Sequence, residues 1–142
     1  MGSRVELHLD QAALRRMLTG PSGEAVRLVR RAQRATMNQG RLRAPVDTGF
    51  LRSTHQATGI HVTGLRVTAE VEATADYAAG VHEGTRPHII RPRRARALAW
   101  QGPSGLVVAR SVRHPGSRPR PWLLNAARAG AGRLGFTVTP GG

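Results

Sequence analysis

The chain has 142 residues, the length of one ordinary domain, and a net charge of +14 that arginine alone supplies because lysine is absent. It contains no cysteine, which excludes disulfides and thiolate metal sites. No apolar stretch approaches the ~18 residues that cross a membrane, and the charged, alternating start is not typical of a secretory signal. We therefore expect a single domain, 1–142, made in the cytoplasm, with a C-terminal tail, 130–142, that frays.

The positive charge predicts an acidic partner. Arginine carries a planar, forked guanidinium group that suits phosphates, carboxylates and interface ion pairs. A GC-rich genome, which favours Arg codons, is one explanation of the absence of lysine. It does not explain the net charge, because such a genome also encodes Asp and Glu readily. The partner is then nucleic acid or an acidic protein surface.

The apolar content predicts a thin core. The chain has two Trp, two Phe and one Tyr. We expect a fold of modest stability that gains order from neighbouring subunits.

The first part of the chain predicts a strand and two helices. Val5, Leu7 and Leu9 alternate with polar residues, as in a half-buried strand. Asp10 is placed to cap a helix that Gly-Pro-Ser-Gly ends at 20–23, and Ser22 is the expected cap of the next helix.

The clearest helix is predicted over 24–39, with Gly40 as its stop. Small residues on its apolar face permit close packing against a sheet or another helix. Its apolar stripe consists of Ala25, Leu28, Val29, Ala32, Ala35 and Thr36. A separate cationic stripe consists of Arg27, Arg30, Arg31 and Arg34.

Two hairpins follow in the pattern. Alternation from 60 to 71 around Thr63-Gly64 predicts the first, and 98–109 around Gly-Pro-Ser-Gly predicts the second. We expect a short helix over 76–83, and a further edge strand at Phe136 and Val138.

Two segments rich in proline and arginine, 86–96 and 113–121, are expected to be extended loops. A short helix over 122–128 follows the second loop. The predicted class is α+β, with an antiparallel sheet packed by a long N-terminal helix and a short C-terminal helix, and with extended basic loops.

Three segments carry a resemblance to a known family. Pro-Val-Asp-Thr-Gly-Phe-Leu-Arg-Ser at 45–53, Tyr-Ala-Ala-Gly-Val-His-Glu-Gly-Thr at 77–85, and Val-Arg-His-Pro-Gly from 112 with Arg-Pro-Trp-Leu at 120–123 occur in that order. They resemble segments of the tail-completion, or head–tail connector (neck), proteins of siphophages, in the branch found in phages of actinobacteria. Trp122 stands where phenylalanine is commoner, and the positive charge exceeds what the family leads us to expect.

The resemblance implies a structural protein of the virion rather than an enzyme, without a cofactor. Such a subunit forms a ring, typically sixfold, at the head–tail junction or the top of the tail. The ring joins the connector or stopper to the tail terminator or tail tube, and contact with packaged DNA in its lumen is an open alternative. The motif residues assigned a structural role are Pro45, Asp47, Thr48, Gly49, Leu51, Arg52, Tyr77, Glu83, Gly84, Thr85 and Pro121.

Catalytic and metal chemistry are disfavoured. His82 and His88 are six residues apart, which matches no standard ligand spacing, and nearby arginines oppose a cation. Ser111 lies in no nucleophile elbow. We assign neither a catalytic residue nor a metal ligand.

The competing interpretation is a basic protein that binds nucleic acid without sequence specificity. Flexible loops of arginine and proline bind phosphates without reading bases. Both interpretations use the same residues, through contact with another subunit or with DNA. The candidates are Arg91, Arg93, Arg94, Arg96, Arg113, His114, Arg118, Arg120, Trp122 and Leu123.

Overall fold

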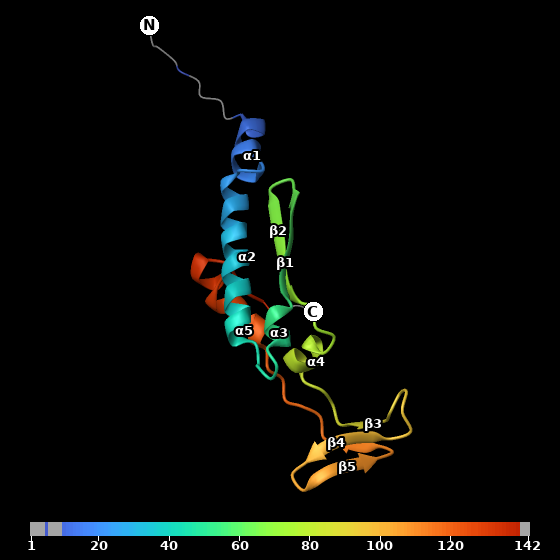
Figure 1. Cartoon of the computed structure of the whole chain (residues 1–142). Helices are drawn as coiled ribbons and strands as arrows, with labels where there is room; N and C mark the ends of the chain where they lie inside the picture. The colour runs from blue at the N-terminus through green and yellow to red at the C-terminus, as the bar shows by residue number, and fades with distance from the viewer. Residues whose placement is uncertain (1–4, 6–9, 140–142) are drawn as a thin grey trace. The chain divides into compact units, whose positions relative to one another are not determined.

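The computed structural model describes Val5 and residues 10–139 (Figure 1). Its helices and antiparallel strands confirm the α+β class. The strand expected from Val5, Leu7 and Leu9 lies outside the described residues, apart from Val5 itself.

The described chain falls into two compact units. The helical unit comprises the chain up to Ala75 together with the chain from Trp122 onward, and the β unit runs from Asp76 to Pro121. The single domain expected from the sequence stays a prediction.

Helix α1, Gln11–Thr19, begins as predicted, because the Asp10 carboxylate accepts hydrogen bonds from the backbone N–H groups of Ala12 and Ala13. The Gly-Pro-Ser-Gly break then separates it from helix α2, Glu24–Arg43. The predicted cap at Ser22 is wrong, since Gly23 is the N-cap residue and no side chain caps this helix.

The expected stop of α2 at Gly40 is also wrong. The helix runs on to Arg43 and ends at Ala44, because Pro45 disfavours helical backbone in the residue before it. Gly40 is buried in the helix, where a Cβ atom would lie 2.9 Å from Cδ2 of His55. Glycine is needed here for close packing and not for termination.

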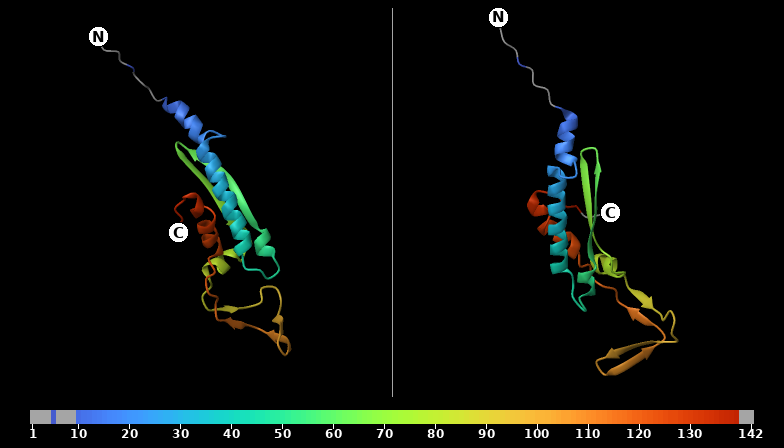
Figure 2. Two further views of the ribbon diagram at one scale, coloured as in Figure 1. Left: turned by 90° about the vertical axis from the view of Figure 1, so that its left-hand side faces the viewer. Right: turned by 45° about the horizontal axis from the view of Figure 1, so that its top comes forward.

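The first predicted hairpin is confirmed as β1, His55–Thr63, paired antiparallel with β2, Arg66–Ala73. Figure 2 shows this hairpin running along α2. Gln33 of α2 donates side-chain hydrogen bonds to the carbonyls of Thr58 and Glu70, which are register partners in the two strands. One side chain thereby fastens both strands to the helix, next to the register shift that follows Thr58.

The C-terminal helix is confirmed as α5, Trp122–Ala129, and it packs on another side of α2 (Figure 2). Ala126 is fully buried in this contact region, and a Cβ atom on Gly130 would lie 2.6 Å from the backbone nitrogen of Thr36. The small residues of α2 thus permit the close approach that the sequence suggested.

The chain beyond 130, expected to fray, contains a 3-10 helix η1, Gly132–Leu134, and residues 140–142 lie outside the described part. The predicted edge strand is wrong, since Phe136 and Val138 belong to no strand.

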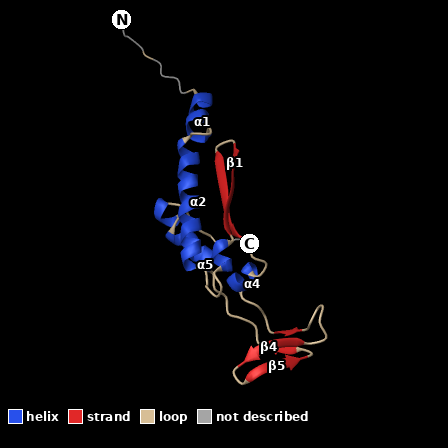
Figure 3. Cartoon of the chain, in the orientation of Figure 1, coloured by secondary structure: helices blue, strands red, loops and turns tan. Residues whose placement is uncertain are grey.

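The β unit contains a short helix, α4, Ala78–Glu83, and two separate antiparallel pairs (Figure 3). The second predicted hairpin is confirmed as β4, Leu98–Gly102, and β5, Gly105–Ala109. We call this hairpin the β-ribbon.

The basic loops are more ordered than expected. They contribute to a short ladder, in which β3, His88–Ile90, pairs with β6, Val112–His114. All three residues of β3 and the last two of β6 lie in segments that were expected to be loops. The prediction rested on the prolines and arginines, but three consecutive residues without proline suffice for such a ladder, and β-branched Ile and Val favour it.

The core is thin in both units. Within the described residues the buried apolar side chains are Val26, Ala32, Ala44, Leu51, Ala75, Ala78, Trp122 and Ala126, and most of them are alanine. No helix in the described part of the chain is long and apolar enough to cross a membrane.

Candidate partner-binding surface

The first motif segment, 45–53, forms the turn between α2 and a one-turn helix, α3, Phe50–Ser53. Gly49 has φ 84°, a left-handed conformation that favours glycine. The Thr48 hydroxyl accepts a hydrogen bond from the backbone N–H of Phe50 at 3.3 Å. Leu51 is buried, whereas Arg52 and Asp47 are exposed. The segment shapes a turn and anchors it through one leucine.

The second and third motif segments meet within the β unit. Thr85 and Ser117 exchange two backbone hydrogen bonds, of 3.1 and 3.0 Å, and their hydroxyls lie 3.1 Å apart. The N–H of Arg120 donates to the carbonyl of Val81 in α4 at 3.0 Å. The two chain segments that enter and leave the β-strands are therefore clamped together at this end of the unit.

Two motif glycines make this clamp possible. A Cβ atom on Gly84 would lie 2.6 Å from the carbonyl oxygen of Ser117, and one on Gly116 would lie 2.3 Å from that of Thr85. Both glycines also have positive φ, of 77° and 86°. A larger residue at either position would push the two segments apart.

The remaining motif residues of the second segment lie on α4. Tyr77 is its N-cap residue and is 48% exposed, and its carbonyl accepts the N–H of Val81. Glu83 ends the helix and is exposed. Pro45 and Pro121 are half-buried.

Trp122, which was expected to contact a partner, lies buried within the helical unit of the single chain. It is 4% exposed, and its indole N–H donates a 3.0 Å hydrogen bond to Nε2 of the buried His55. Leu123 is half-buried, with Cδ1 3.3 Å from the position of a Cβ atom on Gly40. Both residues pack α5 within the helical unit, and a contact of Leu123 with a partner stays a prediction.

The other candidates lie in the β unit, and all their arginines are exposed. They belong to a stretch, residues 86–121, that we call the cationic segment. It holds nine of the 22 arginines and none of the eight acidic residues, so it carries +9 of the net charge of +14. In the described structure none of these arginines pairs with a carboxylate. They are Arg86, Arg91, Arg93, Arg94, Arg96, Arg110, Arg113, Arg118 and Arg120.

His114 has a different environment. It stands opposite His88 in the β3–β6 ladder, with the ring centroids 5.0 Å apart. Its Nδ1 accepts the N–H of Gly116 at 3.0 Å, while Nδ1 of His88 contacts the carbonyl of Arg86 at 2.8 Å. These backbone bonds orient both rings and give His114 a structural role in the turn at Pro115-Gly116.

The β-ribbon presents apolar side chains on both of its faces. Trp100 and Val107 are register partners on one face and are 41% and 38% exposed. Leu106 and Val108 lie on the other face and are 70% and 61% exposed. The ribbon itself contains no charged residue. Such a surface is typical of a protein contact region.

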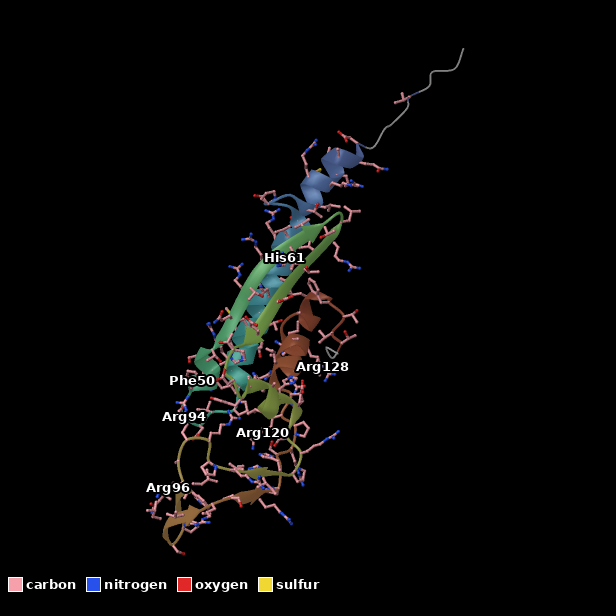
Figure 4. The ribbon with its side chains drawn as sticks, turned by 90° about the vertical axis from the view of Figure 1, so that its right-hand side faces the viewer. Phe50, His61, Arg94, Arg96, Arg120 and Arg128 are labelled. Atoms are coloured by element: carbon pink, nitrogen blue, oxygen red, sulfur yellow. The ribbon has the colours of Figure 1, made fainter. Side chains whose placement is uncertain are left out.

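An open hollow of about 560 Å³ lies at the base of the ribbon, lined by Arg96 and Ala97 on one strand end and by Val108, Ala109 and Arg110 on the other. Figure 4 shows Arg94 and Arg96 on the loop that leads into β4. The guanidinium groups of Arg96 and Arg110 border this partly apolar hollow, an arrangement suited to an anion.

Within the described residues no group of three or more His, Cys, Asp or Glu side chains is arranged to hold a metal ion. Ser111 is exposed, between β5 and β6.

Sequence reasoning missed several residues that the structure uses. Arg110 borders the hollow, and the hairpin register offered a signal, since Ala109 pairs with Leu98 and so brings Arg110 near Arg96. Ser117 pairs with Thr85 without any sequence signal that we recognise. His55 and Gln33 are buried or half-buried polar residues whose partners are distant in sequence.

Comparison of the chain with protein-family models, curated proteins and solved structures finds no significant match.

Proposed function

We propose that this chain is a structural subunit of a bacteriophage neck, which forms a ring at the head–tail junction or the top of the tail and joins the connector to the tail terminator or tail tube. Three motif segments in family order support the proposal. Their residues shape the α2–α3 turn and the clamp of the β unit, so what the resemblance covers is the framework of both units.

The observation that carries the proposal is the exposed apolar surface of the β-ribbon. A two-stranded hairpin is at best marginally stable in water, and it needs cover on at least one face. Here apolar side chains are exposed on both faces, while the buried core consists mostly of alanine. This combination is expected of a subunit whose β-ribbon is covered by a neighbouring subunit in an assembly.

A head-to-tail ring provides that cover. In a heterologous interface each subunit places its β-ribbon against one neighbour and is contacted by the β-ribbon of the other neighbour. The ring closes when the rotation between successive subunits divides evenly into a full turn. Six subunits are the number that the family resemblance suggests. The ring is a component of the virion, assembled in the host cytoplasm.

Ring formation is tested by the mass of the nuclease-treated protein in solution, alone and with purified tail-less heads. We expect a closed ring, or a monomer that joins these particles. Leu106→Ser with Val108→Ser should abolish assembly and leave the far-UV circular dichroism unchanged. Leu65→Ser is the matched control, because Leu65 is 61% exposed in the turn of the other hairpin. A wild-type chain that stays monomeric and joins no particle would refute the proposal.

A second candidate function is a free-standing basic protein that binds nucleic acid without sequence specificity. The cationic segment, which contains no acidic residue, favours it. The two functions differ in assembly: a free-standing protein binds nucleic acid as a monomer and ignores phage particles, whereas a neck subunit joins them.

A further inference from the structure

The charge of the chain is concentrated in one place. The cationic segment carries +9, while the rest of the sequence places 13 arginines among all eight acidic residues. In the helical unit, for example, Arg27 on α2 forms a salt bridge with Glu24. The cationic segment has no such internal partner, and its exposed guanidinium groups repel one another until an anion is bound.

We propose that the cationic segment binds the sugar–phosphate backbone of double-stranded DNA without reading its sequence. The choice of duplex DNA among the polyanions rests on the proposed function, because the phage genome passes through the head–tail junction. The binding surface itself rests on the charges and geometry of the β unit.

The density of charge favours a nucleic acid over an acidic protein. Duplex DNA presents one negative charge per ~1.7 Å of its axis and no positive charge. The surface of a protein normally carries both positive and negative charges side by side. A segment that binds such a surface is therefore expected to carry charges of both signs as well. This segment offers nine cations and no anion over 36 residues, so it matches a uniform polyanion.

The hollow at the base of the β-ribbon supplies one defined phosphate position. Arg96 and Arg110 border it, and Ala97, Val108 and Ala109 complete its lining. Guanidinium groups bind phosphate oxygens through paired N–H donors.

The residue types of the ribbon argue against base reading. Side chains that discriminate bases are mostly Arg, Lys, Asn, Gln, Asp and Glu. Between 98 and 109 the ribbon offers Gln101 alone from this group. Contacts with phosphates position a protein on DNA and carry no sequence information.

The test compares two quadruple variants of the full chain with the same net charge. The first is Arg93→Gln, Arg94→Gln, Arg96→Gln and Arg110→Gln in the β unit. The control is Arg27→Gln, Arg30→Gln, Arg31→Gln and Arg34→Gln, all exposed on α2. Binding to a random duplex of about 20 base pairs is measured by fluorescence anisotropy from about 50 to 200 mM salt.

We expect the β-unit variant to bind at least about tenfold more weakly. The slope of log K against log salt should fall in magnitude by up to about 3.6, since four arginines are replaced and each phosphate contact contributes about 0.9. The α2 control should keep the wild-type slope. Equal losses in both variants would overturn the proposal, because net charge alone would then explain binding. Competition by polyglutamate as strong as that by unlabelled DNA would overturn it in favour of an acidic protein partner.

The masses of wild type and variants are measured in the same samples. A β-unit variant that loses DNA binding but still assembles leaves both proposals intact. A wild-type protein that assembles but binds no DNA overturns the DNA proposal and leaves the neck function. A monomer that binds DNA, never assembles and joins no head overturns the neck function instead.

Discussion

The indole N–H of Trp122 donates a 3.0 Å hydrogen bond to Nε2 of His55, across 67 residues of sequence. Both residues are buried, with exposures of 4% and 2%, and their rings meet edge to face at 75°. Trp122 is the first residue of α5 and His55 the first of β1. The bond therefore fixes the point at which the chain returns from the β unit to the helical unit.

The same geometry fixes the tautomer of His55. An indole N–H is only a donor, so Nε2 must accept and carries no proton. Nδ1 lies 3.1 Å from the carbonyl oxygen of Arg52, which is only an acceptor, so Nδ1 carries the proton. Both nitrogens of the buried ring therefore have hydrogen-bond partners.

Replacing Trp122 by phenylalanine should destabilise the helical unit. The change keeps an aromatic ring but leaves Nε2 of His55 buried without its donor, which costs about 1–3 kcal/mol. The measurement is the free energy of unfolding by chemical denaturation. The matched control is Trp100→Phe, because Trp100 is 41% exposed and should change stability by no more than about 0.5 kcal/mol.

A double variant separates the hydrogen bond from simple packing. With His55→Leu already present there is no acceptor left, so adding Trp122→Phe should cost less than it does in the wild type by about 0.5–3 kcal/mol. Equal costs in the two backgrounds would mean that the bond contributes nothing to stability.

Gly40→Ala should lower stability, although alanine is the better helix former by about 1 kcal/mol. The new Cβ atom would lie 2.9 Å from Cδ2 of the buried His55, and overpacking of this kind costs about 1–3 kcal/mol. Asn38→Ala, at an exposed position of the same helix, is the control and should be neutral or slightly stabilising. A stabilised Gly40→Ala variant would show that the His55 ring moves away easily.

Gly84→Ala should open the clamp between the two motif segments of the β unit. Its Cβ atom would lie 2.6 Å from the carbonyl oxygen of Ser117, at a backbone φ of 77°. Strain of about 1–3 kcal/mol should reduce the hydrogen-exchange protection of the Thr85 and Ser117 amides by about fivefold or more. Gly80→Ala in α4 meets a methyl group at 3.3 Å and should preserve protection. Unchanged protection in Gly84→Ala would count against the clamp.

Local patterns predicted the elements of this fold well. The helical stripe of α2, the Asp10 cap and the alternation of both hairpins depend on neighbours a few residues apart, and a sequence displays these directly. The left-handed turn at Gly49 was predictable for the same reason, because its conformation is a property of one residue and its turn.

Long-range packing decided the features that the sequence did not predict. From the sequence alone Gly40 is predicted to end a helix, whereas in the structure it is the residue that lets His55 pack against the helix. Trp122 is predicted to anchor an interface, whereas the structure buries its side chain and bonds its N–H to that histidine. The β3–β6 ladder joins residues 22 to 26 positions apart through three-residue strands, too short for an alternating pattern to be visible. In each case the deciding partner lies far away in sequence.

Charge reversal in the cationic segment should block the joining of heads and tails while leaving the fold intact. Arg93, Arg94 and Arg96 are exposed and unpaired with any carboxylate in the described structure, so replacing all three by glutamate removes no internal bond. The variant should keep the unfolding free energy of the wild type within about 1 kcal/mol, the usual range of surface substitutions.

The readout is complementation of a phage that lacks this chain, with joined particles counted by electron microscopy. Three glutamates repel either an acidic neighbour or packaged DNA, so joined particles should be lost. Reversal of Arg30, Arg31 and Arg34 on α2 is the matched control and should restore joining, because these exposed arginines lie on the helical unit, outside the cationic segment. Normal numbers of joined particles with the Arg93, Arg94 and Arg96 reversal would show that this loop takes no part in assembly. Loss of joined particles with both variants would show that net charge alone, and not this loop, governs joining.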